Sequence, residues 1–158
     1  MNSAIAVAIF MVGCLLQSVI GFLNGTQLSA QLKLYDGVYY DNPFALITFE
    51  VANRCYQLDC GNLDSRVASA RWSGLPTQGW LRKNVLISFY ADADCKGAQE
   101  SVVLPHNGGI REFYLKKVIG KISAFMVRLD GLHATYGYEN VCNSYFDKNA
   151  TLRLRTSN

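Results

Sequence analysis

The sequence predicts an all-β domain, and two observations carry that prediction. Residues 85–90 form a run of β-branched and aromatic side chains that is typical of a largely buried strand. Elsewhere, short apolar segments alternate with turns rich in Gly, Asn, Asp and Pro, and no amphipathic helix longer than about three turns is indicated after the N-terminal segment. The chain has 158 residues, of which 50% are hydrophobic, so it can bury one core and we expect a single domain.

A hairpin is predicted directly after this strand. The polar residues 92–94 end the strand, and a second apolar segment, 101–104, resumes after Gly97. Glycine adopts positive φ without strain, so Gly97 lets the chain fold back. Because Tyr90 precedes this glycine in the same hairpin, we expect its ring to pack over the position that has no Cβ.

Residues 89–97 resemble the first-strand signature of βγ-crystallin Greek key motifs. In that signature two aromatic residues, here Phe89 and Tyr90, precede several polar residues, a further aromatic and a glycine. Cys95 stands in the place of the later aromatic, so we expect a disulfide to brace the hairpin there. The family also has a serine that hydrogen-bonds back to the hairpin, and the resemblance implies this role for Ser69 and Ser123, which lie in similar apolar frames.

The resemblance implies two Greek key motifs that form a single β-sandwich, because one motif alone leaves an apolar face uncovered. The first motif is the weaker match: residues 39–56 contain aromatics and an apolar strand, but no clear aromatic-to-glycine hairpin. We place the domain at residues 35–146 and a polar C-terminal tail at residues 147–158.

Residues 1–23 are predicted to be a secretory signal peptide. The first 32 residues carry no charged side chain, and residues 4–23 are almost entirely apolar. The alternative is an uncleaved anchor, because about 20 apolar residues can span a bilayer. Cleavage fits after Gly21 or near Ala30. We expect a secreted, extracellular protein that contacts a membrane only if this leader is retained.

Loss of the leader would remove Cys14 and leave an even number of cysteines. In a secreted domain this predicts two disulfides, with three connectivities open, among Cys55, Cys60, Cys95 and Cys142. Zinc is disfavoured because the four do not form clustered pairs. The sequence Asn149-Ala-Thr predicts a glycosylation site at Asn149.

We expect no metal site and no cofactor. Many βγ-crystallins bind calcium through acidic or amide residues shortly before the conserved serine. Mapped onto this chain, the second motif places Val118, Ile119 and Ile122 there, which offer no side-chain oxygen. The first motif keeps Asp64 but has Ala68 where a hydroxyl is usual.

Enzymatic and nucleic-acid-binding functions are disfavoured. His106 and His133 lie in turns outside any Ser/His/Asp or Cys/His frame, so we expect no catalytic residues. The formal net charge is +3 and the basic residues are dispersed, whereas nucleic-acid binding requires a basic stripe.

The resemblance implies a secreted, non-enzymatic binding or toxin-like module that acts on cell walls or on host or microbial surfaces. We expect a monomer whose loops 74–80 and 105–109 contact a cell-wall glycan or a secreted protein. Trp72 is assigned to the core, and Trp80 is left open between burial and exposure. Two alternatives remain: a structural, crystallin-like extracellular protein without a ligand, and, less favoured, a small secreted hydrolase.

Overall fold

The computed structural model describes residues 27–59, 63–79, 83–104, 108–113, 118, 120–129 and 133–141. The all-β class is confirmed, because strands dominate this part of the chain. The elements are β1 (Gln27–Tyr35), the short 3-10 helix η1 (Val38–Tyr40), β2 (Pro43–Val51), β3 (Cys55–Gln57), β4 (Ser69–Ser73), β5 (Leu86–Tyr90), β6 (Gln99–Val103), β7 (Gly109–Ile110), β8 (Ala124–Arg128) and β9 (Tyr138–Asn140).

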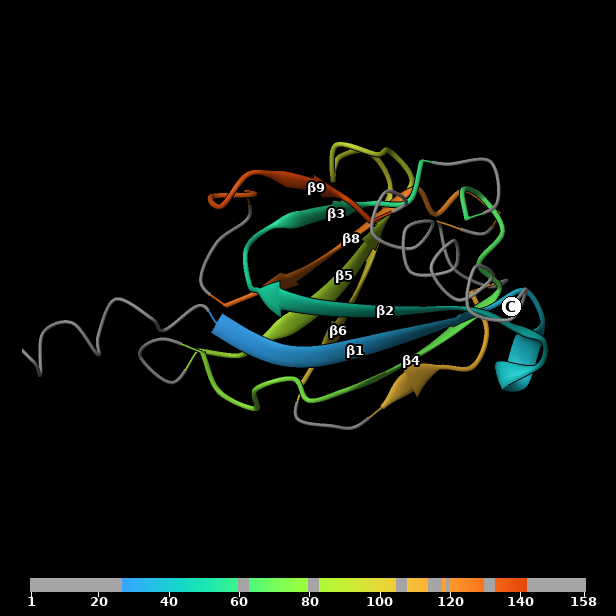
Figure 1. Cartoon of the computed structure of the whole chain (residues 1–158), viewed down its shortest axis with the longest axis horizontal. Coiled ribbons are helices and arrows are strands. Elements are labelled where there is room, and N and C mark those ends of the chain that lie inside the picture. The colour runs from blue at the N-terminus through green and yellow to red at the C-terminus, as the bar shows by residue number, and fades with distance from the viewer. Residues whose placement is uncertain are drawn as a thin grey trace, which may run out of the picture.

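Two sheets stack face to face (Figure 1). The four-stranded sheet has the order β2-β1-β4-β7, and the five-stranded sheet has the order β6-β5-β8-β3-β9. Strands β1–β4 form the first motif and β5–β8 the second, and each motif contributes its third strand, β3 or β7, to the other sheet. The predicted single sandwich of two Greek key motifs is therefore confirmed, and the exchanged strands join the motifs into one core.

Strand β9 is an addition to this plan. It pairs in parallel with β3, Cys55 opposite Tyr138, and Figure 1 shows it beyond β3 at the edge of the sheet. An unpaired edge of β3 would expose backbone N–H and C=O groups, and β9 covers that edge.

The core lies between the sheets and is rich in aromatic rings. Phe49 of β2 packs edge-on against Phe125 of β8, with ring centroids 5.2 Å apart, and Tyr56 stacks on Phe125 at 5.0 Å. Trp72 is 4% exposed and lies 6.2 Å from Phe89, which confirms its assignment to the core. These contacts join strands of both sheets, so burial of these rings is what holds the layers together.

The sandwich begins upstream of residue 35, where the sequence-based domain boundary falls. Strand β1 starts at Gln27 and pairs along its length with β2 and from Gln31 onward with β4. The polar residues of β1 alternate with buried ones, as expected for a strand with one solvent-facing side. Strand β1 therefore belongs to the domain.

The predicted leader, Cys142, Asn149 and the predicted C-terminal tail lie outside the described residues, as do Cys60, Trp80 and His106. Within the described ranges, no helix has the length and apolar character needed to cross a membrane.

The first motif contains the folded hairpin that the sequence did not reveal. Gly37 N–H donates to Asp41 O in the first motif, as Asp92 N–H donates to Lys96 O in the second. Asn42 has a φ of 54°, two residues after the aromatic Tyr40, and so stands in the place of Gly97. Asparagine tolerates left-handed geometry better than other non-glycine residues, so the hairpin folds without a glycine.

Candidate functional site

The signature residues of the second hairpin have structural positions. Phe89 is fully buried and packs against Phe113 with ring centroids 4.9 Å apart. Gly97 has a φ of +71°, as predicted. The three atoms closest to a Cβ on Gly97 all belong to the Asp92 carboxylate. Tyr90 lies in a small cluster with the cysteines Cys55 and Cys95, and its packing over Gly97 stays a prediction.

A disulfide joins Cys55 and Cys95, with a Cα–Cα distance of 5.9 Å. Cys55 begins β3 of the first motif, and Cys95 lies in the hairpin of the second. The bridge therefore fastens one motif to the other and occupies the place of the missing aromatic ring. In the first hairpin that place is held by Tyr40, whose ring lies 5.7 Å from the ring of Tyr35. With Cys55 paired to Cys95, the two predicted disulfides leave Cys60 and Cys142 for a second bridge, which stays a prediction because both residues lie outside the described part of the chain.

Ser69 has the role that the resemblance implies. Its Oγ accepts from Tyr40 N–H at 3.1 Å and donates to Gly37 O at 2.6 Å, so it ties β4 to the first hairpin. Burial of this serine is complete, and both hydrogen bonds satisfy backbone groups that the turn leaves free.

Ser123 does not repeat this arrangement. The role that the resemblance implies for Ser123 is wrong, because the position equivalent to Ser69 is one residue later. In the first motif Tyr35 pairs with Ser69, whereas in the second Tyr90 pairs with Ala124. Ala124 therefore takes the place of Ser69, and Ser123 lies one residue before it. A shift of one residue turns a side chain to the other face of a strand.

The hydroxyl of Ser123 contacts the first motif instead. Ser123 Oγ donates to Asp64 Oδ1 at 2.5 Å, and Ser65 Oγ donates to the same oxygen at 3.3 Å. Ser65 N–H also donates to Ile122 O at 3.1 Å. These contacts tie the turn before β4 to the segment before β8. Across the described ranges no three His, Cys, Asp or Glu side chains converge as metal ligands.

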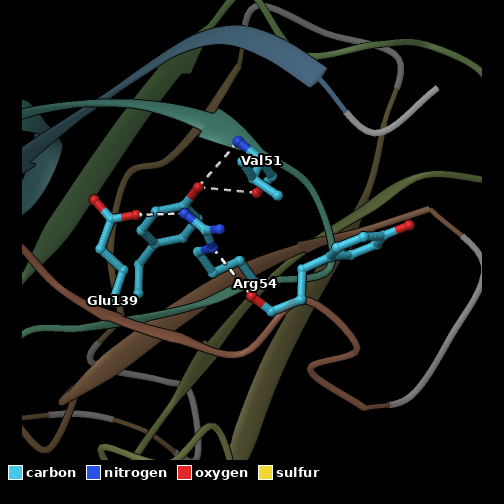
Figure 2. Close-up of polar contacts among 5 residues, drawn as sticks. Val51, Arg54 and Glu139 are labelled. Atoms are coloured by element: carbon cyan, nitrogen blue, oxygen red, sulfur yellow. Dashed lines mark hydrogen bonds and ion pairs between the residues drawn. The ribbon is translucent and has the colours of Figure 1, made fainter. Parts of the chain in front are cut away.

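A second polar cluster closes the end of β3 (Figure 2). Tyr56 Oη accepts from Val51 N–H at 3.0 Å and donates to Val51 O at 2.9 Å. Arg54 donates to Glu139 Oε2 of β9 at 2.9 Å and to Tyr136 O at 3.1 Å. Burial raises the pKa of the Tyr56 phenol, which keeps the hydroxyl protonated and able to donate. The cluster fastens β2, β3 and β9 together.

Replacing Tyr56 by Phe should lower the free energy of unfolding by about 1 to 3 kcal/mol, because both backbone groups of Val51 lose their partner. Tyr90→Phe is the matched control. Among the described residues no hydrogen-bond partner reaches the buried Tyr90 Oη, so its removal should leave stability unchanged or slightly raised. Urea denaturation of both variants measures the difference. Equal losses would show that Tyr90 Oη does have a partner.

The outer face of the four-stranded sheet carries a groove of about 590 Å³. Its lining residues alternate along β1 and β4 with core residues, so they point away from the core. The groove crosses the sheet from β2 to β7, and its main side chains are Gln31, Lys33, Tyr40, Leu46, Arg71 and Ser73.

Two cations stand side by side in this groove. Lys33 of β1 pairs directly with Arg71 of β4 in the strand register, and both are exposed. The Arg71 guanidinium lies 4.1 Å from the centre of the Tyr40 ring, and Lys33 Nζ lies 5.5 Å from that of Tyr35. Within the described part of the chain neither forms an ion pair, whereas Arg54, Arg66 and Lys96 each do. The groove is therefore electropositive.

One of the two predicted contact loops reaches the groove. Gly108 and Gly109 line it at the β7 side, where Trp72 N–H donates to Gly108 O at 2.9 Å. None of the described residues 74–79 of the other loop line the groove. His133 is exposed and lies away from the groove lining. Sequence reasoning missed the groove, although Lys33 and Arg71 were visible as charged residues in the middle of otherwise strand-forming segments.

No protein-family model and no curated protein matches the chain. Solved structures similar to it include one described under "Evolution of the eye lens beta-gamma-crystallin domain fold", with 17% identity and a TM-score of 0.44 over 68% of this chain and 93% of that one. A βγ-crystallin domain from Clostridium beijerinckii has 11% identity and a TM-score of 0.41, with 65% and 99% covered. Hahellin, a βγ-crystallin, has 16% identity and a TM-score of 0.38, with 68% and 98% covered.

These similarities concern the fold alone. The description of the fold rests on the chain's own topology: two Greek key motifs, each with a folded hairpin that contains residues of positive φ, exchange their third strands within one sandwich. By that topology the fold of this protein is βγ-crystallin-like.

Proposed function

We propose that the protein is a secreted, non-enzymatic binding module that uses the groove on its four-stranded sheet to hold a surface or cell-wall component. The single observation that carries this proposal is the pair of exposed cations, Lys33 and Arg71, which have no ion-pair partner among the described residues and lie in a groove built on regular strands. Side chains on strands are held more precisely than those on loops, so this surface is preorganised for a ligand.

Two further features support secretion. The uncharged, apolar N-terminal residues fit a leader, and the Cys55–Cys95 bridge is of the kind that persists in oxidising compartments.

The proposal is tested by binding. The mature, isotope-labelled protein is incubated with chitin oligomers, acidic plant and bacterial polysaccharides and intact microbial cells, and bound samples are mapped by amide chemical shifts. We expect at least one of these to shift amides of β1, β4 and residues 108–109. If no material binds and the protein only shows high thermal stability, the structural alternative is favoured. Binding that shifts amides elsewhere would contradict the groove as the site.

A further inference from the structure

We propose that the ligand of this groove is an acidic saccharide, whose anionic group is held between Lys33 and Arg71. This inference rests on the proposed function and names the ligand class. Like charges directly opposite each other on neighbouring strands repel and lower the stability of the fold. Lys33 and Arg71 are such a pair, and no described carboxylate forms an ion pair with either of them.

The arrangement keeps both charges in place. The Tyr40 and Tyr35 rings hold the cationic groups by cation–π contacts, which leave the N–H donors free for an anion. A guanidinium presents its N–H groups as a planar fork that matches a carboxylate or sulfate, and a neighbouring ammonium adds a second charge.

Gly109 fixes the wall beside Arg71. A Cβ at this position would lie 2.5 Å from Ala70 O, 2.8 Å from Tyr40 Oη and 2.9 Å from Arg71 Cγ. The glycine thus allows Tyr40 and the Arg71 stem to pack against the β7 backbone. The Arg71 cation is therefore positioned by the residues around it.

The remaining lining suits hydroxyl groups and a sugar ring. Gln31 and Ser73 lie opposite each other on β1 and β4 and offer an amide and a hydroxyl on the groove side. Leu46, which pairs with Lys33 from the other side, is 53% exposed and offers a small apolar contact. Charge, hydrogen-bonding groups and one apolar patch within about 590 Å³ match a short saccharide segment.

Other anionic partners fit less well. Attraction to an anionic membrane contributes about 1 kcal/mol for each Lys or Arg, so two cations are too few for stable membrane binding. Nucleic-acid binding requires a longer stripe of basic residues than these two provide. A protein partner would require an apolar or aromatic anchor pocket. Of the aromatic residues in the lining, Tyr35 and Trp72 are buried and the Arg71 guanidinium lies over the Tyr40 ring, so Leu46 is the main exposed apolar contact among the described lining residues.

The test titrates the mature protein by calorimetry with three hexasaccharides: an oligogalacturonate, a sulfated heparin-type fragment and neutral chitohexaose. We expect binding of at least one acidic hexasaccharide, weakened by salt, and no comparable binding of the neutral one. Comparison of the oligogalacturonate with the sulfated fragment distinguishes recognition of a carboxylate from recognition of a sulfate. Lys33→Gln and Arg71→Gln should each weaken this binding about tenfold, because each removes a charge-assisted hydrogen bond.

Lys83→Gln is the matched control, because Lys83 is exposed, carries the same charge and lies outside the groove lining. It should leave the affinity nearly unchanged. Melting temperatures verify folding of each variant. If Arg71→Gln is unfolded, Leu46→Glu in the groove and Val103→Glu on β6 form a second matched pair, both at exposed aliphatic positions, and only the former should weaken binding.

Four results would overturn the inference. The first is no binding of either acidic hexasaccharide, and the second is equal loss in Lys83→Gln, which would indicate unspecific attraction by net charge. The third is tighter binding of chitohexaose with amide shifts on β1 and β4; that result removes the acidic ligand but leaves the groove as the binding site, so the proposed function would stand. The fourth is binding of an acidic hexasaccharide with amide shifts only outside the groove, which would refute both the inference and the proposed function.

Discussion

Replacing both Cys55 and Cys95 by alanine should lower the free energy of unfolding by about 4 kcal/mol. The two bridged cysteines are 40 residues apart in the sequence. A cross-link over a loop of this length lowers the conformational entropy of the unfolded chain enough to stabilise the fold by about 4 kcal/mol. Both cysteines are buried, and alanine introduces no polar group at either position, so the change tests mainly the loss of the covalent link. Urea denaturation gives the midpoint and the m-value for both proteins.

Reducing agent supplies the control for this prediction. The unmodified protein should lose stability on reduction, and any further loss in the reduced double variant reports the predicted bridge between Cys60 and Cys142. A loss below about 1 kcal/mol in the double variant would contradict the bracing role of the Cys55–Cys95 bridge, since bridges of this kind usually add 2 to 4 kcal/mol.

The bridge also explains why the two hairpins differ. The first hairpin is braced by Tyr40 and by the hydrogen bonds of Ser69, whereas the second has Cys95 and Ala124 at the equivalent positions. Covalent attachment to β3 replaces both of those contacts. One element therefore braces the second hairpin and links the two motifs at the same point.

Much of the second motif could be predicted from sequence, because its signals are local. The strand β5, the turn after it and the positive φ of Gly97 follow from alternation and from the freedom of glycine. The burial of Trp72 likewise follows from its alternation with Ala70 on the inner face of a strand. Such signals depend on neighbours along the chain and need no knowledge of the partner strand.

The first hairpin, the place of Ser123 and the groove depend on contacts that sequence order hides. Asn42 performs the backbone role of a glycine, so a search for glycine misses the hairpin. Ser123 and Ser69 lie in similar apolar frames, but only strand register shows that they are not equivalent. Lys33 and Arg71 become neighbours only because β1 and β4 pair.

Gly97→Ala should lower the free energy of unfolding by about 2 to 3 kcal/mol, from two separate causes. The first is the positive φ, which costs an L-residue about 1 to 2 kcal/mol. The second is steric: the new Cβ would overlap the Asp92 carboxylate, whose residue holds the turn through backbone hydrogen bonds to Lys96 and Cys95. Moving that side chain disturbs the same hairpin that the disulfide anchors.

Gly120→Ala and Gly137→Ala separate these causes. Both glycines have positive φ, 54° and 75°, but no described atom lies within 4 Å of a Cβ at either position. They should therefore show the backbone cost alone, partly offset by the about 0.4 to 1 kcal/mol that alanine gains by restricting the unfolded chain. Denaturant midpoints of the three variants make the comparison. If Gly97→Ala loses no more stability than the other two variants, the Asp92 side chain can move aside without cost. The disulfide would then hold the second hairpin without help from close packing around Gly97.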